Sequence, residues 1–155
     1  MLAAILAVLA LSDPATVQVE SLKFDPASIQ KAASQVEVKL MEGGEAVTYK
    51  GVPLRSLLAD RLKGPNAMAD LRNLADAVLV VRASDDYQAA LSAAEVAMDE
   101  SGQKYLLATE RNGKPLDPKQ GVVKLIVPGD PQHVRWVRMV SGVDLVRMPK
   151  AKAKP

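Results

Sequence analysis

The sequence contains no cysteine and a single histidine, His133. Without a thiol, the chain cannot form disulfides, thiolate metal sites, iron–sulfur clusters or a cysteine nucleophile. A single histidine also makes a His-rich zinc or iron site hard to build. The G-x-S-x-G, G-x-G-x-x-G and P-loop patterns are missing as well. These absences exclude most common classes of enzyme.

Aromatic residues and net charge are scarce too. Aromatics make up 3% of the 155 residues and hydrophobic residues 48%, so the core has to be mainly aliphatic. A net charge of +2 is too small to indicate nucleic-acid binding, and we expect no nucleic-acid partner. Part of the positive excess lies in residues 148–155, where Lys150, Lys152 and Lys154 predict a disordered basic tail. This tail is most simply solvated, although it could be attracted to an acidic partner or a lipid surface.

The N-terminal segment 1–15 contains an unbroken apolar run over residues 2–11. This run is too short to span a bilayer comfortably, but it suits the hydrophobic region of a secretory signal peptide. Basic residues before it and a clean A-x-A cleavage site are missing, so a buried N-terminal helix and an uncleaved anchor stay open as alternatives. We expect a periplasmic or otherwise exported protein with a single domain over residues 16–147.

The rest of the chain alternates between short strand patterns and short helix patterns. Val17 and Val19 are expected to face inward from a strand over residues 16–22, and the unbroken apolar segment 77–82 predicts a strand buried on both faces. Asp25-Pro26 is typical of a helix start. The other predicted strands cover residues 36–41, 46–49, 105–110, 122–127, 134–140 and 143–146, and the predicted helices cover residues 27–33, 53–62, 69–74 and 92–98. The pattern predicts a mixed α+β domain dominated by strands, with short helices.

Four sequence blocks carry a resemblance to a known family. They are Tyr49-x-Gly51-Val52-Pro53-Leu54-x-x-Leu57-Leu58, Ala83-x-Asp85-Asp86-Tyr87, Asn112-Gly113-x-Pro115-Leu116 followed by Gly121-x-x-Lys124-Leu125-Ile126-Val127-Pro128, and Arg135-Trp136-Val137-Arg138-x-Val140. In this order they resemble the blocks of the sulfite-oxidase-like molybdopterin-binding domain family, over about residues 17–146. The resemblance implies the strand-dominated α+β fold of that family.

The chain departs from the family pattern where catalysis depends on it. In catalytic members, a cysteine between the first hairpin strand and the G-V-P-L helix binds molybdenum through its thiolate. Here residues 41–48 form only a short segment around Gly43-Gly44, and no residue of the chain supplies a thiolate. Asp86 replaces a glycine of the family and Val122 a proline, and Asp adopts a left-handed backbone less easily than Gly. We therefore expect no oxygen-atom transfer by this chain alone.

The resemblance extends to a small subgroup of exported, cysteine-free domains, the PruR-like pterin-binding proteins. It implies a non-catalytic module that binds a reduced pterin, holds no metal cofactor and regulates a membrane signalling partner. Two alternatives stay open. One is a molybdopterin-dependent oxidoreductase with atypical metal ligation, and the other is a ligand-free protein-interaction scaffold.

Pterin binding needs an aromatic stacking surface, a carboxylate for paired N–H donors and a donor for the ring carbonyl. Trp136 beside two guanidinium groups could supply the stacking surface, unless it packs in the core. Asp85 at the end of a predicted strand could accept the N–H pair, although a solvated turn is the simpler alternative. The predicted pterin cluster consists of Arg82, Ser84, Asp85, Asp86, Tyr87, His133, Arg135, Trp136 and Arg138.

Simpler structural roles exist for several of these residues. A salt bridge would account for Arg82, and a lone histidine such as His133 is usually structural or solvated. Tyr49 is expected to pack against the helix that follows it rather than to contact a ligand.

Overall fold

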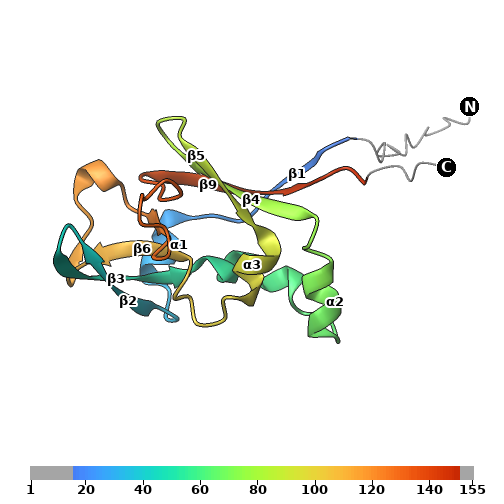
Figure 1. Cartoon of the computed structure of the whole chain (residues 1–155), viewed down its shortest axis with the longest axis horizontal. Coiled ribbons are helices and arrows are strands. Elements are labelled where there is room, and N and C mark those ends of the chain that lie inside the picture. The colour runs from blue at the N-terminus through green and yellow to red at the C-terminus, as the bar shows by residue number, and fades with distance from the viewer. Residues whose placement is uncertain (1–15, 151–155) are drawn as a thin grey trace, which may run out of the picture.

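The computed structural model describes residues 16–150, and the predicted leader and the last five residues of the predicted tail lie outside this range. The described chain folds into two antiparallel sheets, as Figure 1 shows. The first sheet has the strand order β1 (Gln18–Ser21), β9 (Val140–Arg147), β4 (Ala77–Ala83) and β5 (Gln88–Ser92). The second contains β2 (Val36–Glu42), β3 (Glu45–Pro53), β6 (Leu106–Arg111) and β7 (Lys114–Pro115), and β8 (Lys124–Ile126) also pairs with β6. The predicted strand-dominated α+β fold is confirmed.

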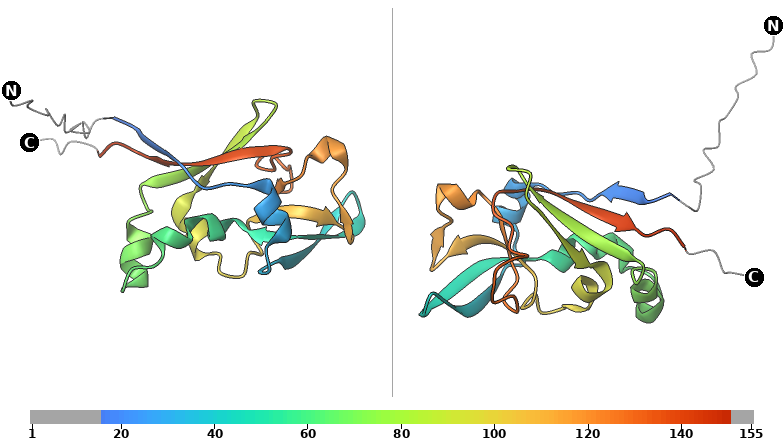
Figure 2. Two further views of the ribbon diagram at one scale, coloured as in Figure 1. Left: turned by 180° about the vertical axis from the view of Figure 1, so that it is seen from behind. Right: turned by 45° about the horizontal axis from the view of Figure 1, so that its top comes forward.

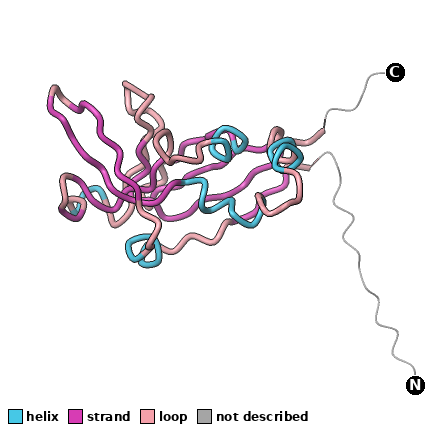
Figure 3. Tube along the Cα trace, turned by 90° about the horizontal axis from the view of Figure 1, so that it is seen from below, coloured by secondary structure: helices cyan, strands magenta, loops and turns pink. Residues whose placement is uncertain are grey.

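The helices are short and separate the strands without forming a layer of their own (Figure 3). They are α1 (Pro26–Lys31), the 3₁₀ helix η1 (Leu54–Arg61), α2 (Ala67–Arg72), α3 (Ala93–Met98) and the 3₁₀ helix η2 (Pro118–Gln120). Asp25 caps α1 as predicted, because its carboxylate accepts the backbone N–H groups of Ala27 and Ser28. Within residues 16–150, no helix combines the length and apolarity needed to cross a membrane.

The predicted hairpin around Gly43-Gly44 is confirmed, and β3 extends to Pro53, through the start of the predicted helix. At Gly51 the pairing of β3 with β6 shifts by one residue, and a Cβ here would collide with the carbonyl oxygen of Leu107. This close approach of two backbones explains why the block needs glycine at this position.

One buried aliphatic cluster joins the two sheets, with Leu79 and Leu145 from the first and Val38 and Val47 from the second. The prediction that residues 77–82 are buried on both faces is wrong. Alternate residues of β4 are buried, whereas Val78 and Val80 are only half-buried and Arg82 is exposed. The apolar run therefore belongs to an antiparallel sheet with one open face.

The inward orientation predicted for Val17 and Val19 is also wrong, since their side chains are 48% and 63% exposed. β1 pairs only with β9 and forms the edge of its sheet (Figure 2). An edge strand without a second neighbour buries little of either face.

Residues 134–140 do not form the predicted strand, apart from the start of β9 at Val140 and one bridge between Val137 and Leu125. His133 and Met139 have φ angles of 54° and 49°, which interrupt an extended chain. As a result, Val134 is exposed, while Trp136 and Val137 are both buried. A regular strand over residues 134–140 would have placed Val134, Trp136 and Arg138 on one face, and the structure does not have this alternation.

Candidate functional site

A buried lysine marks the most unusual polar position of the domain. Lys124 lies on β8 with 8% of its surface exposed, and its ammonium is 5.0 Å from the ring centre of Trp136 and 5.6 Å from that of Tyr49. Over the described residues it forms no ion pair with a carboxylate. Burial lowers the pKa of Lys124, Glu42 opposes this shift, and Arg111 and Arg138 add to it. The two rings supply part of the stabilisation that water would otherwise give.

Lys124 lines a cavity of about 410 Å³ beside the β2–β3 hairpin. The cavity brings together side chains from five elements or their flanking loops, which are far apart in sequence. Its lining consists of Glu42, Tyr49, Arg111, Leu116, Asp117, Lys119, Gln120 and Lys124. We call this the Lys124 cavity. Its size is within the range of small-molecule sites, and its charges are mixed with a cationic excess.

One wall of the Lys124 cavity is held together by its own polar contacts. The hydroxyl of Tyr49 donates a hydrogen bond of 2.9 Å to Oε2 of Glu42, and Arg111 donates to the same oxygen over 3.4 Å. Burial and this hydrogen bond raise the pKa of Tyr49 to about 12. Tyr49 is itself 1% exposed, so it forms part of the core as well as part of the wall.

Gln120, another residue of the lining, has an amide oxygen without a partner. The Oε1 atom of Gln120 is buried, and no residue in 16–150 donates a hydrogen bond to it. Its backbone is fixed, because its N–H donates to the Asp117 carbonyl over 2.7 Å and its carbonyl accepts the N–H of Met139 over 2.8 Å. A buried acceptor left unpaired is unfavourable, so a turn of the Gln120 side chain that brought Oε1 to a donor in the cavity would be favourable.

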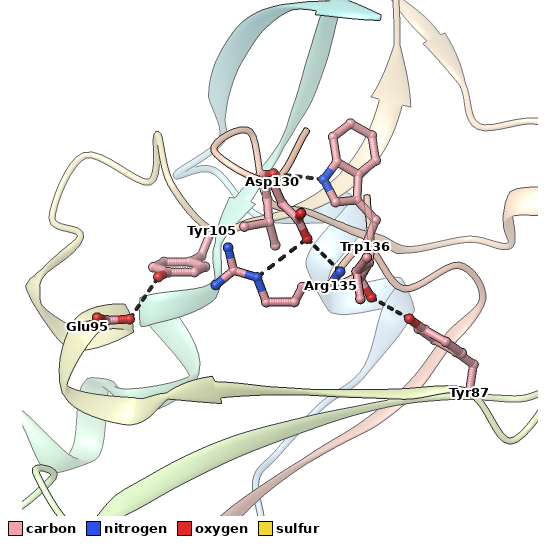
Figure 4. A network of polar contacts seen from close by, with 8 residues as sticks. Tyr87, Glu95, Tyr105, Asp130, Arg135 and Trp136 are labelled. Atoms are coloured by element: carbon pink, nitrogen blue, oxygen red, sulfur yellow. Dashed lines mark hydrogen bonds and ion pairs between the residues drawn. The ribbon is translucent and has the colours of Figure 1, made fainter. Parts of the chain in front are cut away.

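The predicted pterin cluster comes together only in part, as Figure 4 shows for its central members. Ser84, Asp85 and Asp86 form the turn between β4 and β5, and the Asp85 carboxylate accepts the N–H of Tyr87 over 3.2 Å. The Tyr87 hydroxyl donates to the carbonyl oxygen of Val134, so this turn contacts the segment before Trp136.

Arg135 and Trp136 are also engaged within the protein. Asp130 accepts the backbone N–H of Arg135 over 2.7 Å and its guanidinium over 3.5 Å (Figure 4). Trp136 is 7% exposed, and its indole N–H donates to the Val127 carbonyl over 2.8 Å. The imidazole of His133 stacks on Trp136 with 3.8 Å between ring centres, and Tyr49 meets the indole edge-on at 5.9 Å. The indole is therefore packed in the core, which was the alternative to an open stacking surface.

The two remaining arginines of the predicted cluster, Arg82 and Arg138, differ in their contacts. Arg82 forms a 2.8 Å salt bridge with Asp144, which also accepts a hydrogen bond from Ser21. Arg138 is exposed and acts on Lys124 through its charge. None of the nine residues lines the Lys124 cavity directly, although Trp136 contacts Lys124 from behind. Their role in pterin binding stays a prediction.

Sequence reasoning missed Lys124, Gln120, Arg111 and Glu42 as site residues. The one available signal was Lys124 itself, a charged residue in the middle of the apolar segment 122–127. The other three become site residues only because β2, β6 and η2 meet in the fold, and no local sequence pattern predicts that meeting.

The donor set does not suit a molybdenum centre. A thiolate is missing from the whole sequence, and no methionine lines the Lys124 cavity. Within residues 16–150, no group of three His, Cys, Asp or Glu side chains could hold a metal ion. The residues that are present can donate to and accept from an organic ligand, but they cannot anchor a high-valent metal.

The family model of the oxidoreductase molybdopterin binding domain matches residues 16–153. No curated protein matches the chain significantly.

Proposed function

The chain belongs to the oxidoreductase molybdopterin-binding domain family, and from this premise we propose that it is a non-catalytic module that binds a reduced pterin in the Lys124 cavity. The observation that carries the proposal is the pair of Lys124 and Gln120, one a buried lysine whose ammonium has no carboxylate partner and the other a buried acceptor without a donor. Such groups are rare in a structure unless a ligand or water satisfies them.

The chemistry of this pair matches the edge of a pterin. The Lys124 ammonium would donate to the ring carbonyl, and the Gln120 side chain would turn its Oε1 into the cavity to accept from the exocyclic amino group or a ring N–H. One donated and one accepted hydrogen bond would recognise the amide-like edge of the ring. The bond from Lys124 would be the stronger of the two because its donor is charged. Lys119 lines the same cavity and forms no ion pair within residues 16–150, so it is free to approach an anionic or polar substituent, whereas Arg111 is already paired with Glu42.

The absent thiolate separates binding from catalysis. A domain that keeps a ligand cavity but lacks the metal ligand is suited to sensing the ligand rather than transforming it. The proposed setting is an exported protein whose occupied state is recognised by a membrane signalling partner. This setting rests on the apolar run over residues 2–11 and on the resemblance to cysteine-free exported domains.

The test is a titration of the chain with a tetrahydropterin, followed by calorimetry and by the fluorescence of Trp136, the only tryptophan. Because Trp136 lies 5.0 Å from the Lys124 ammonium, its emission should report occupation of the cavity. We expect saturable one-to-one binding. Complete absence of binding would favour the ligand-free scaffold, whose partner would then be sought among proteins.

Two variants locate the ligand. Lys124→Met keeps the length of the side chain and removes its charge, and we expect binding to weaken about 10- to 100-fold, as for the loss of a hydrogen bond to a charged group. Lys114→Met is the matched control, since Lys114 is exposed on β7 and does not line the cavity. If pterin binds equally well to wild type and to Lys124→Met, the ligand lies elsewhere, and Asp85→Asn becomes the variant to examine.

A further inference from the structure

Lys124 differs from the other lysines of the domain in its burial. It is 8% exposed, whereas every other lysine within residues 16–150 is exposed, apart from the half-buried Lys50. It also forms no ion pair with a carboxylate among these residues. Lys124 is therefore the one lysine of the described chain that combines burial with the lack of a counter-ion.

The charges around Lys124 favour its neutral amine. Burial is the main cause of its lowered pKa, and the guanidinium groups of Arg111 and Arg138 lower it further by repulsion. Glu42 opposes this shift, but its Oε2 already accepts hydrogen bonds from the Tyr49 hydroxyl and from Arg111. Lysines that are desolvated or lie beside other cations are the ones that act as nucleophiles, because more of their amine is neutral at a given pH.

The Lys124 cavity is large enough to bring a small carbonyl compound to this amine. Its volume of about 410 Å³ is ample for a molecule of a few non-hydrogen atoms. Lys119 lines the same cavity, is exposed and forms no ion pair within the described residues. A ligand with a carbonyl at one end and an anionic group at the other would suit these two lysines, one as a nucleophile and one as a cation.

We propose that Lys124 forms a Schiff base with a small aldehyde that carries an anionic group. The neutral amine adds to the carbonyl carbon, and the π electrons of the carbonyl pass to its oxygen. Both amine protons then leave with that oxygen as water, so amine and aldehyde give imine and water without an oxidant, a reductant or a metal. A protonated imine is still a cation, so it keeps the stabilisation that the rings of Trp136 and Tyr49 give to the Lys124 ammonium.

This reaction goes beyond pterin binding and does not depend on it. The missing thiolate is no obstacle, because no metal takes part. A pterin and an aldehyde would compete for the same amine, and either could occupy the cavity without the other. Competition between them therefore tests the two functions separately.

The test exposes the full chain to glyoxylate, a small aldehyde with a carboxylate, in the presence of sodium cyanoborohydride, which reduces each imine to a stable secondary amine. Peptide mass spectrometry gives the rate of modification at each lysine. We expect Lys124 to react several-fold faster than Lys114, an exposed lysine on β7, and we expect this preference to vanish in urea. A rate at Lys124 no higher than at Lys114 would overturn the proposal.

The variant Lys119→Gln tests the role of the anionic group. It should slow the reaction of glyoxylate at Lys124 several-fold and leave that of the neutral propionaldehyde unchanged. Lys104→Gln removes an exposed charge outside the cavity, so it is the matched control and should change neither rate. Equal glyoxylate rates in Lys119→Gln and wild type would overturn the requirement for an anionic group.

Repeating the reaction with a tetrahydropterin distinguishes this inference from the proposed function. If the pterin binds and slows the reaction at Lys124, both stand. A selective reaction that saturating pterin does not slow supports Schiff-base formation and places the pterin elsewhere. Pterin binding without a selective reaction at Lys124 overturns Schiff-base formation alone.

Discussion

The Lys124 cavity and the predicted pterin cluster differ in whether their polar groups have partners within the protein. In the cluster, the indole N–H of Trp136, the guanidinium of Arg135 and the hydroxyl of Tyr87 each donate to an acceptor of the protein. In the cavity, the ammonium of Lys124 has no carboxylate partner and Oε1 of Gln120 has no donor among the described residues.

This difference separates residues that hold the fold from residues that are available to a ligand. A ligand that bound the cluster would have to replace hydrogen bonds that already exist, with little net gain. A ligand in the cavity would satisfy groups whose burial is unfavourable without it. The four predictions below test this comparison, beginning with the largest expected effect.

Trp136→Ala should lower the free energy of unfolding by about 3–5 kcal/mol, because it leaves a cavity in the core and removes the partner of the Val127 carbonyl. Urea denaturation measures this loss. Trp136→Phe, which keeps most of the packing, should lose much less. A loss below about 1 kcal/mol for the alanine variant would mean that the indole is free for stacking, and the comparison between the two regions would fail.

The raised pKa of Tyr49 predicts a specific loss of stability at alkaline pH. From its ordinary value of 10.0 the pKa rises to about 12, so between these values the folded state binds more protons than the unfolded state. The stabilisation is therefore fully present below pH 10 and is lost as the pH rises towards 12, by up to about 2 kcal/mol. We expect the midpoint of urea unfolding to fall more steeply with pH in wild type than in Tyr49→Phe. Parallel curves would mean that the Tyr49 hydroxyl is not buried against Glu42.

The sequence predicted those parts of the fold that local rules determine. Asp25 caps α1, Gly43-Gly44 makes the β2–β3 turn, and the family blocks identified the domain. The same rules failed for residues 134–140, whose apolar alternation is interrupted by the positive φ angles of His133 and Met139. Those angles depend on contacts with distant segments, such as the bond from the Met139 N–H to the Gln120 carbonyl.

The candidate site was less predictable for the same reason. An aromatic residue flanked by arginines is a reasonable ligand site in sequence, but only the fold shows that Trp136 is covered by His133 and Tyr49. Conversely, Gln120 has no distinguishing neighbours in sequence. Its importance comes from the burial of one atom, which is a property of the assembled structure.

Replacement of Lys124 by arginine should change how pterin affinity depends on pH, because arginine keeps its positive charge where lysine loses it. Burial lowers the pKa of Lys124, so pterin affinity should be constant at neutral pH and fall as the pH approaches the ordinary lysine value of 10.5 from below. Arginine stays protonated throughout this range. We expect the affinity of wild type to become about tenfold weaker than that of Lys124→Arg after normalisation to neutral pH. Identical pH profiles by calorimetry would show that the Lys124 ammonium does not contact the ligand.

The smallest predicted effect concerns the turn of the predicted pterin cluster. Asp86 has a φ of 68°, in the left-handed region where a side chain is unfavourable and glycine is not. Asp86→Gly should therefore stabilise the domain by about 0.5 kcal/mol, measured as a rise of about 1–2 °C in Tm. Ser84→Gly is the matched control, since Ser84 in the same turn has an ordinary φ and should lose stability through added chain entropy. If the turn only supports the fold, both variants should bind pterin as wild type does, whereas a tenfold change in affinity for Asp86→Gly would place the ligand at the turn and not at Lys124.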